Sequence, residues 1–425
     1  MSTIEKHDMT QGKILLPLVS FTIPLVLGNL FQLTYNAADS VIVGKYVGEQ
    51  ALAAVGTSTP IMNIAILLIS GMCMGASVLM SSQYGAKDYD TLSRQISTTM
   101  LAGCGFSVVF SLLMLLLANP VLRLIRVPET AIPEAAAYLR IIFMGLIFTF
   151  MYNFLANTMR ALGDSKTPLY FLVTSAFLNI FGDLFFVVVL RWGVAGSAIA
   201  TVCSEGLCCL LCGIYIKKKI PLLCLGKKWW VFDKSLLGKT VSYGSTSAMQ
   251  QVCLQLGKLI IQSVVNTQGV AVMAAFTAVN RVDDFAYTPQ QNIGHAMTTF
   301  LAQNKGAGHK ERMKKGFQTG LLIELVYSIG LFCVIWGLAP QIMTLFAEDG
   351  DAQVVSLGIS YLHLISWMYI LPGLTNGVQG FFRGIGDLKV TLYSTFMNMF
   401  GRVVAVFVMI LSLIHISEPT RLRRI

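Results

Sequence analysis

Charged residues are scarce in this sequence. Asp, Glu, Lys and Arg make up 12% of its 425 residues, whereas 55% of the residues are hydrophobic and the mean hydropathy is +0.68. A soluble protein carries about 25% charged residues. The composition therefore excludes a soluble globular chain and predicts an all-α polytopic membrane protein. The sequence also lacks H-E-x-x-H, G-x-S-x-G and a phosphate-cradling glycine loop, so we expect no enzyme activity.

Long apolar runs take the place of the missing charge. A membrane-spanning helix needs about 20 apolar residues. The chain offers eleven candidate spans, at residues 14–38, 50–80, 95–118, 133–157, 168–190, 194–216, 237–265, 270–302, 317–340, 353–380 and 388–411. No signal-peptide cleavage pattern precedes the first run, which we therefore count as a retained span.

Basic residues predict the orientation of these spans. With the N-terminus in the cytoplasm, the inward loops carry eighteen Lys and Arg residues, and the outward loops with the span ends beside them carry five. The positive-inside rule favours this arrangement in a plasma (inner) membrane. The formal net charge of +10 thus reflects basic loops beside a lipid bilayer, and we expect no nucleic-acid partner.

The two halves of the chain resemble each other. Arg160-Ala-Leu-Gly-Asp recurs as Arg383-Gly-Ile-Gly-Asp, 223 residues later, and Gly48-Glu-Gln-Ala-Leu-Ala-Ala matches the stretch from Gly269, 221 residues later. Such matches indicate a duplication with six spans per half, which makes the repeats parallel. We assign 1–216 to an N-terminal lobe, 217–236 to a basic cytoplasmic linker and 237–411 to a C-terminal lobe.

The last residues, 412–425, break the apolar pattern abruptly. Their sequence, SLIHISEPTRLRRI, resembles the translated read-through of a sequencing-library adapter. Eleven spans cannot complete a six-plus-six duplication, and an odd number would leave three arginines outside. We therefore hypothesise that this tail is not native and that a twelfth span is missing.

A polar face in the first span carries the main functional signal. Gln32, Tyr35, Asn36 and Asp39 follow an i, i+3, i+4, i+7 pattern and share one side of the helix. An acidic group at membrane depth costs about 2.5–3.5 kcal/mol and usually marks an ion or proton pathway. The alternative places Asp39 at the end of the span, among the outer headgroups.

A second polar constellation lies on the fifth and sixth spans. Asn179 and Asp183 share one helical face at i, i+4, and Thr201 on the next helix can face them. Carboxylate, amide and hydroxyl oxygens suit Na⁺, or a proton shared between Asp183 and Asp39. The alternative is a buried polar cluster that only holds the lobe together.

Several motifs together resemble the multidrug and toxic compound extrusion (MATE) transporters over residues 10–411. They are P-L-V-L-G-N-L…Y-N…D-S-V-I-V-G-K-Y-V-G, the following A-L-A-A-V-G, the turn at Gln303–Gly308 and the paired R-x-x-G-D loops. The resemblance implies two six-helix lobes around a central cavity and drug export driven by Na⁺ or H⁺, with no other cofactor. The positions that match the family's N-lobe cation site are Asp39, Asn179, Asp183 and Thr201.

The resemblance also frames a mechanism. We expect a monomeric antiporter of organic cations in which Pro24 lets the first span bend, because proline removes a backbone hydrogen bond. The predicted cavity wall consists of Tyr35, Asn36, Tyr152, Asn153, Gln290 and Gln291. The alternative is a lipid-linked oligosaccharide flippase of related architecture, which would need a cationic cavity for pyrophosphate.

Other polar residues within spans keep two interpretations. Asp283 and Asp284 could form a second ionic site, although pairing with Arg281 is the favoured interpretation, and Lys258 could snorkel or pair with one of these acids. His295 and His363 are interpreted as helix contacts, with a proton relay as the alternative. The cysteine cluster at 208–212 is interpreted as apolar packing.

Overall fold

A computed structural model describes residues 8–125, 127–220, 230–346 and 352–421 of the protein, and within these ranges all regular structure is helical. The α-helices are α1 (Leu15–Tyr46), α2 (Glu49–Gly85), α3 (Tyr89–Leu124), α4 (Ile132–Met144), α5 (Leu146–Ala161), α6 (Lys166–Asp183), α7 (Gly193–Lys219), α8 (Lys234–Val265), α9 (Val270–Gly306), α10 (Lys310–Phe346), α11 (Ala352–Ser366), α12 (Ile370–Gly384) and α13 (Leu388–Arg421). A π-helical segment (Leu184–Val189) follows α6, and 3₁₀ turns (Asn266–Gln268 and Trp367–Tyr369) follow α8 and α11.

The helices confirm the predicted all-α membrane fold. Each of the eleven predicted spans coincides with one helix or with consecutive helical segments separated by a short break. Among the described residues, eight helices are long and apolar enough to cross a membrane, or up to nine if α4 and α5, bent by 47°, form one span. Helices α8 and α9 are not in that set. Both carry uncharged polar residues such as Gln and Thr in addition to their charged ones.

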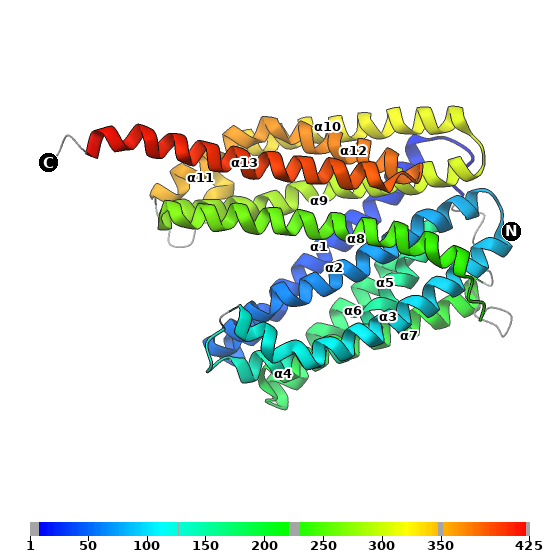
Figure 1. Ribbon diagram of the computed structural model, residues 1–425, viewed down its shortest axis with the longest axis horizontal. Coiled ribbons are helices and arrows are strands. Elements are labelled where there is room, and N and C mark those ends of the chain that lie inside the picture. The colour runs from blue at the N-terminus through cyan, green and yellow to red at the C-terminus, as the bar shows by residue number, and fades with distance from the viewer. Residues whose placement is uncertain (1–7, 126, 221–229, 347–351, 422–425) are drawn as a thin grey trace.

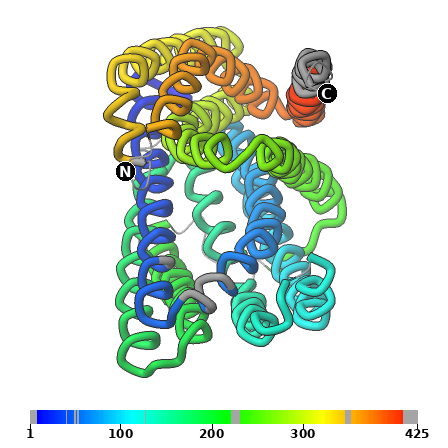
Figure 2. Tube along the Cα trace, turned by 90° about the vertical axis from the view of Figure 1, so that its left-hand side faces the viewer, coloured from blue at the N-terminus to red at the C-terminus, as the bar shows by residue number. Residues whose placement is uncertain are grey.

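Two helical bundles diverge from a shared end. Helices α1 to α7 form one lobe and α8 to α13 the other, and the lobes converge near the end of α2 and the start of α8 (Figure 1). Seen from the opposite end, α1 passes from the second lobe down along the first (Figure 2). The predicted linker, 217–236, overlaps the end of α7 at 217–219 and the start of α8 at 234–236, and its residues 221–229 lie outside the described residues. Helix α13 continues to Arg421, and whether residues 412–425 are native stays a prediction.

Glycines with left-handed backbone conformations repeat between the halves. Gly48 and Gly269 precede α2 and α9 with φ of 116° and 103°. Gly163 and Gly386, in the two R-x-x-G-D loops, have φ of 90° and 85°. Residues that carry a side chain rarely adopt these φ values, so glycine is needed at each turn. The same turns at the same spacing support a duplication in the backbone as well as in the sequence.

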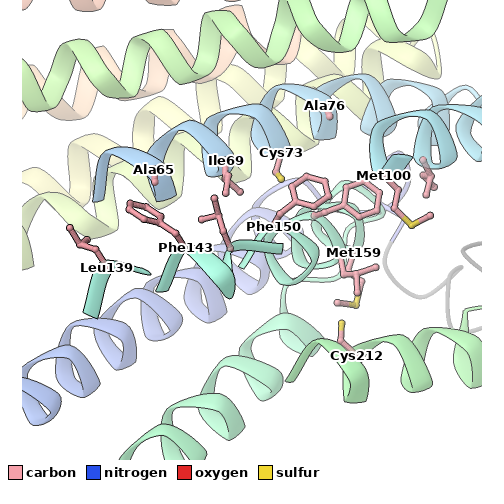
Figure 3. Packing of buried hydrophobic residues seen from close by; sticks show 14 of the residues in the cluster. Ala65, Ile69, Cys73, Ala76, Met100, Leu139, Phe143, Phe150, Met159 and Cys212 are labelled. Atoms are coloured by element: carbon pink, nitrogen blue, oxygen red, sulfur yellow. The ribbon is translucent and has the colours of Figure 1, made fainter. Parts of the chain in front are cut away.

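The first lobe has a continuous apolar core. Ile69 and Cys73 of α2 face Phe143 of α4 and Phe150 of α5, and all four are at most 2% exposed (Figure 3). Cys212 of α7 is fully buried at the edge of the same cluster. The cysteine cluster at 208–212 therefore contributes to packing, and the described residues contain no group of three His, Cys, Asp or Glu side chains that could hold a metal ion.

Hydrogen bonds tie the lobes together where they converge. The Gln303 amide of α9 accepts from the Met9 backbone N–H (3.2 Å) and donates to the Ala161 carbonyl at the end of α5 (2.8 Å). The Arg312 guanidinium donates to backbone carbonyls of residues 9–12 at 2.6 to 3.2 Å. The segment before α1 is thus held against the second lobe.

The lobes approach so closely at this end that only glycine fits. A Cβ added to Gly306 would lie 1.8 Å from the Ser82 carbonyl oxygen, and one added to Gly85 would lie 1.9 Å from the Gln303 carbonyl oxygen. Both obstacles are backbone atoms of the opposite lobe, which cannot move as a side chain can. The junction therefore requires glycine on both sides.

We predict that Gly306→Val lowers the stability of the folded protein, because the new side chain overlaps α2. Overpacking of this kind costs about 1–3 kcal/mol. Thermal unfolding of the detergent-solubilised protein measures the effect. Gly330→Val is the matched control, since nothing lies within 4 Å of a Cβ at Gly330. Equal melting temperatures for the two variants would contradict the packing described for the junction.

Candidate functional site

Two carboxylates from distant parts of the chain meet inside the first lobe. Asp39 of α1 is half-buried, and Asp183 at the end of α6 is fully buried. Their charges interact directly, and the Ser197 hydroxyl of α7 donates a hydrogen bond of 2.6 Å to Asp39 Oδ1. Two neighbouring carboxylates in an apolar lobe repel each other unless a positive charge lies between them. The pair therefore has the chemistry of a cation site.

Asn179 and Thr201 complete the predicted constellation. The Asn179 side-chain amide donates to Thr201 Oγ1 across the α6–α7 contact, at 3.2 Å. Asn179 Oδ1 and both carboxylate oxygens of Asp183 are buried without a hydrogen-bond donor in the described part of the chain. Buried acceptors are normally satisfied, and each orphan is costly. These three oxygens fit a bound Na⁺ or proton, which would remove the deficit.

Small residues let α6 and α7 come close enough for this contact. A Cβ at Gly182 would lie 3.0 Å from Ala200 Cβ, and one at Gly196 would lie 3.0 Å from the Phe186 carbonyl oxygen. Directly after Asp183 the helix changes to a π-helix over Leu184–Val189. Such π-segments are rare and occur frequently at functional sites. The local backbone thus sets the position of the buried acid.

Three further polar residues lie in this part of the first lobe. Ser197 contacts Asp39 directly, and Tyr138 of α4, only 3% exposed, lies within electrostatic range of both carboxylates. Glu205 of α7 accepts a hydrogen bond from the Thr149 hydroxyl at 2.5 Å. None of these three residues was predicted from the sequence. Glu205 could have been found, because it is an acid within an apolar run, the argument already applied to Asp39.

Glu205 borders a small cavity between α2, α4, α5 and α7. Thr201 lies on the same wall, so the cavity adjoins the cation constellation. Its accessible interior is about 20 Å³, which is room for a water molecule but not for a drug. The cavity therefore places Glu205, a third acid, close to Thr201, but it is too small to hold a drug.

The predicted cavity residues lie in different surroundings. Tyr35 is within electrostatic range of Asp39 and Glu205, and Asn36 beside it is exposed. Tyr152 is half-buried and its hydroxyl donates to the Pro168 carbonyl at 3.4 Å.

The remaining three predicted residues divide between the two lobes. Asn153 of α5 donates to the Thr149 carbonyl within its own helix. Gln290 is fully buried in the second lobe, where its amide donates to Ser328 Oγ and to the Tyr369 carbonyl. Gln291 is half-buried. The structure thus brings Tyr35 to the acid pair and places Gln290 in a separate polar cluster.

Pro24 lies where α1 passes between the lobes. Leu18 and Leu25 of α1 pack in one apolar cluster with Ile293 and Phe300 of the second lobe. Only three residues after Leu25, Gly28 faces Leu172 of α6, and Val43 packs in the first lobe. The buried Pro24 is therefore at the transition.

The acids of α9, Asp283 and Asp284, do not pair with Arg281 as the favoured interpretation predicted. Lys258 Nζ lies 3.3 Å from Asp284 Oδ1, and Asp283 accepts a hydrogen bond from the Tyr369 hydroxyl. Neither acid forms an ion pair with Arg281 among the described residues, because α8 brings Lys258 to Asp284 and the broken α11–α12 segment brings Tyr369 to Asp283. The predicted Arg281 pairing is wrong, and of the two interpretations of Lys258 the pairing with one of these acids is confirmed.

Both span histidines make helix contacts. Nδ1 of His295 lies 3.3 Å from Nη1 of Arg383. Nε2 of His363 lies 3.2 Å from the Trp336 carbonyl oxygen, and its ring lies against the Trp336 ring with the centroids 4.5 Å apart. These contacts agree with the interpretation that both residues join neighbouring helices.

A protein family and several known proteins are similar to this chain over most of its length. The MatE family profile matches the chain twice, at residues 24–185 and 247–408. The probable multidrug resistance protein YpnP of Bacillus subtilis (strain 168) is 32% identical over 392 residues, covering 92% of this chain and 86% of the relative. The probable multidrug resistance protein YoeA of the same organism is 29% identical over 390 residues, covering 90% and 83%.

A solved structure shows the same fold. A MOP superfamily transporter from Pyrococcus furiosus superposes with a TM-score of 0.88 at 23% identity, over 96% of this chain and 91% of that chain. The double profile match covers both halves of the duplication predicted from the sequence. The protein therefore belongs to the MatE family of multi-pass membrane transporters, as the sequence resemblance implied.

Proposed function

We propose that the protein exports organic cations across the plasma membrane in exchange for an inward-moving small cation, Na⁺ or H⁺. The observation that carries the proposal is a set of three buried oxygens, on Asp183 and Asn179, that have no donor among the described residues, with Asp183 beside Asp39. A cation bound there would neutralise the carboxylate charge and give the unpaired oxygens a partner. The names of YpnP and YoeA as probable multidrug resistance proteins support drugs as the exported class.

Coupling follows if the acid pair changes the shape of α1. Asp39 lies on α1, 15 positions after Pro24, and the bond from Ser197 holds it to α7. Cation binding at Asp39 and Asp183 draws α1 toward α6 and α7, and Pro24 absorbs the bend because its nitrogen makes no backbone hydrogen bond. The end of α1 that packs on the second lobe then moves relative to the first lobe. Exchange between inward- and outward-facing states is rocking of the lobes.

The charge of the site favours cationic over anionic substrates. Asp39 and Glu205 lie within electrostatic range of both Tyr35 and Tyr138, and Asp183 lies within range of Tyr138, so aromatic rings and carboxylates share one region of the first lobe. Aromatic rings attract organic cations, and carboxylates pair with them. A pyrophosphate-carrying lipid would meet repulsion here, which disfavours the flippase alternative.

Energetics limit how many ions must move. One charge that crosses 100 mV releases about 2.3 kcal/mol, which can concentrate a neutral substrate roughly 40-fold. Exchange of one ion for one monocationic drug moves no net charge, so the voltage contributes nothing. The ion's own gradient, or a second ion, must then drive export.

We predict that Asp39→Asn combined with Asp183→Asn abolishes gradient-driven export, because neutral amides remove the charge that attracts the coupling ion. Efflux of ethidium from proteoliposomes is measured in two arms, one with an imposed Na⁺ gradient at equal pH and one with a pH gradient without Na⁺. We expect a loss of at least tenfold in whichever arm drives the parent protein. Asp90→Asn, at an exposed position in the first turn of α3, is the matched control. Undiminished efflux by the double variant would refute the coupling role.

We predict that Pro24→Ala slows export several-fold but leaves cation binding intact, because a continuous hydrogen-bond ladder stiffens α1 without touching the acids. The measurement compares efflux in proteoliposomes with equilibrium binding of the driving ion. Pro120→Ala, at an exposed proline within α3, is the control for removing a helix proline elsewhere. Export at the parent rate by Pro24→Ala would show that α1 does not bend at this position.

A further inference from the structure

A buried acid in the second lobe has no partner among the described residues. Glu324 of α10 is 0% exposed, and neither of its carboxylate oxygens has a hydrogen-bond donor in the described part of the chain. None of the ion pairs formed by the described residues involves it. A carboxylate taken out of water without a partner is among the most costly arrangements in a protein, unless it binds a cation or a proton.

Other polar groups of α9 and α10 lie close to this carboxylate. Gln290 of α9 donates to Ser328 Oγ at 3.0 Å and to the Tyr369 carbonyl at 2.8 Å, and Ser328 lies one turn after Glu324 on α10. Gln290 Oε1 is buried without a donor as well. The cluster therefore holds three orphan acceptor oxygens together with a hydroxyl and a backbone carbonyl.

Gly373 of α12 marks the point where the cluster converges. A Cβ at this glycine would lie 2.8 Å from Ser328 Oγ, 3.2 Å from Gln290 Nε2 and 3.3 Å from Glu324 Oε2. One point within 3.3 Å of all three polar groups shows that side chains from α9 and α10 meet against the bare backbone of α12. A methyl group at this position would crowd the site.

The chain break beside the cluster adds a further ligand type. Helix α11 ends at Ser366, a 3₁₀ turn covers Trp367–Tyr369, and α12 begins at Ile370. The Tyr369 carbonyl therefore lies at a helix interruption, where it accepts from Gln290. In transporters, carbonyls at interrupted helices coordinate coupling ions.

The cluster is not the repeat counterpart of the first-lobe site. At the repeat spacing of 221 to 223 residues, Asp39 corresponds to 260–262 and Asp183 to 404–406, and neither range contains an acid. Glu324 in turn corresponds to 101–103, which also contain no acid. The second lobe thus carries its buried acid on a different helix of the repeat.

We propose that Glu324, Gln290, Ser328 and the Tyr369 carbonyl bind one Na⁺ ion in the second lobe, separately from the Asp39–Asp183 site. Na⁺ accepts several hard oxygen ligands at once, whereas one proton cannot satisfy three orphan oxygens. A single carboxylate neutralises one positive charge, which matches a monovalent ion better than Ca²⁺ or Mg²⁺. This site does not depend on the antiport proposed above.

Binding of ²²Na⁺ to the purified full-length protein tests the proposal. The background is Asp39→Asn with Asp183→Asn, so that the first-lobe site cannot contribute. We expect this background to bind about one Na⁺ per chain and the addition of Glu324→Gln to weaken that binding at least tenfold. Glu324→Gln removes an uncompensated charge, so we expect the variant to remain folded, which gel filtration and thermal unfolding verify.

A glycine pair provides the matched control. In the same background, Gly373→Ala is expected to weaken Na⁺ binding because its methyl group enters the point of convergence, whereas Gly337→Ala retains it, since nothing lies within 4 Å of a Cβ there. Two results overturn the proposal: a folded background that binds no Na⁺, or Na⁺ binding that survives Glu324→Gln. Because the acid pair is already neutral, neither result bears on its role in export.

Discussion

Carboxylates held inside apolar lobes without compensating donors are the constraint on which the account depends. Asp183 is fully buried, and its oxygens find no donor in the described residues, although the nearby Ser197 hydroxyl donates to Asp39. A fold that served packing alone would gain nothing from such an arrangement, because an apolar residue would be cheaper at the same place. In the proposed function, a cation from the membrane's ion gradients binds these oxygens. We propose that the acid pair in this way couples the protein to the energy of an ion gradient.

Helix α1 connects this local chemistry to the arrangement of the lobes. Its first turns pack on the second lobe and its last turns pack in the first, with Pro24 between. A change at Asp39 consequently reaches the interface between the lobes through one continuous element. The tight glycine junction at Gly85 and Gly306 keeps the far end of the lobes together. In the proposed mechanism, bending near Pro24 and a fixed junction together let the lobes rock without separating.

Much of the fold was predictable because it follows from composition and periodicity. Span positions, the parallel duplication and the turns at Gly163 and Gly386 each have a local sequence signal. The i, i+4 spacing of Asn179 and Asp183 likewise predicted one shared face, and the Asn179–Thr201 hydrogen bond joins two predicted members. These features depend on neighbours in the chain, which a sequence displays directly.

What could not be predicted depends on contacts between distant segments. Gln290 was expected in the drug cavity, yet the interruption at Trp367–Tyr369 presents a carbonyl that holds it inside the second lobe. The π-helix after Asp183 has no simple sequence signature. Glu205 and Glu324 are different, because each is an acid within an apolar run, which is a signal that the sequence itself carries.

Mutual dependence of drug and ion binding tests the central claim most directly. If the coupling ion and an organic cation compete through the Asp39–Asp183 site, the equilibrium affinity for ethidium must fall as Na⁺ or H⁺ concentration rises, by the reciprocity of linked binding. The account predicts this dependence in the parent protein and its disappearance when both aspartates are asparagine. The same ion dependence in the asparagine variant would contradict it.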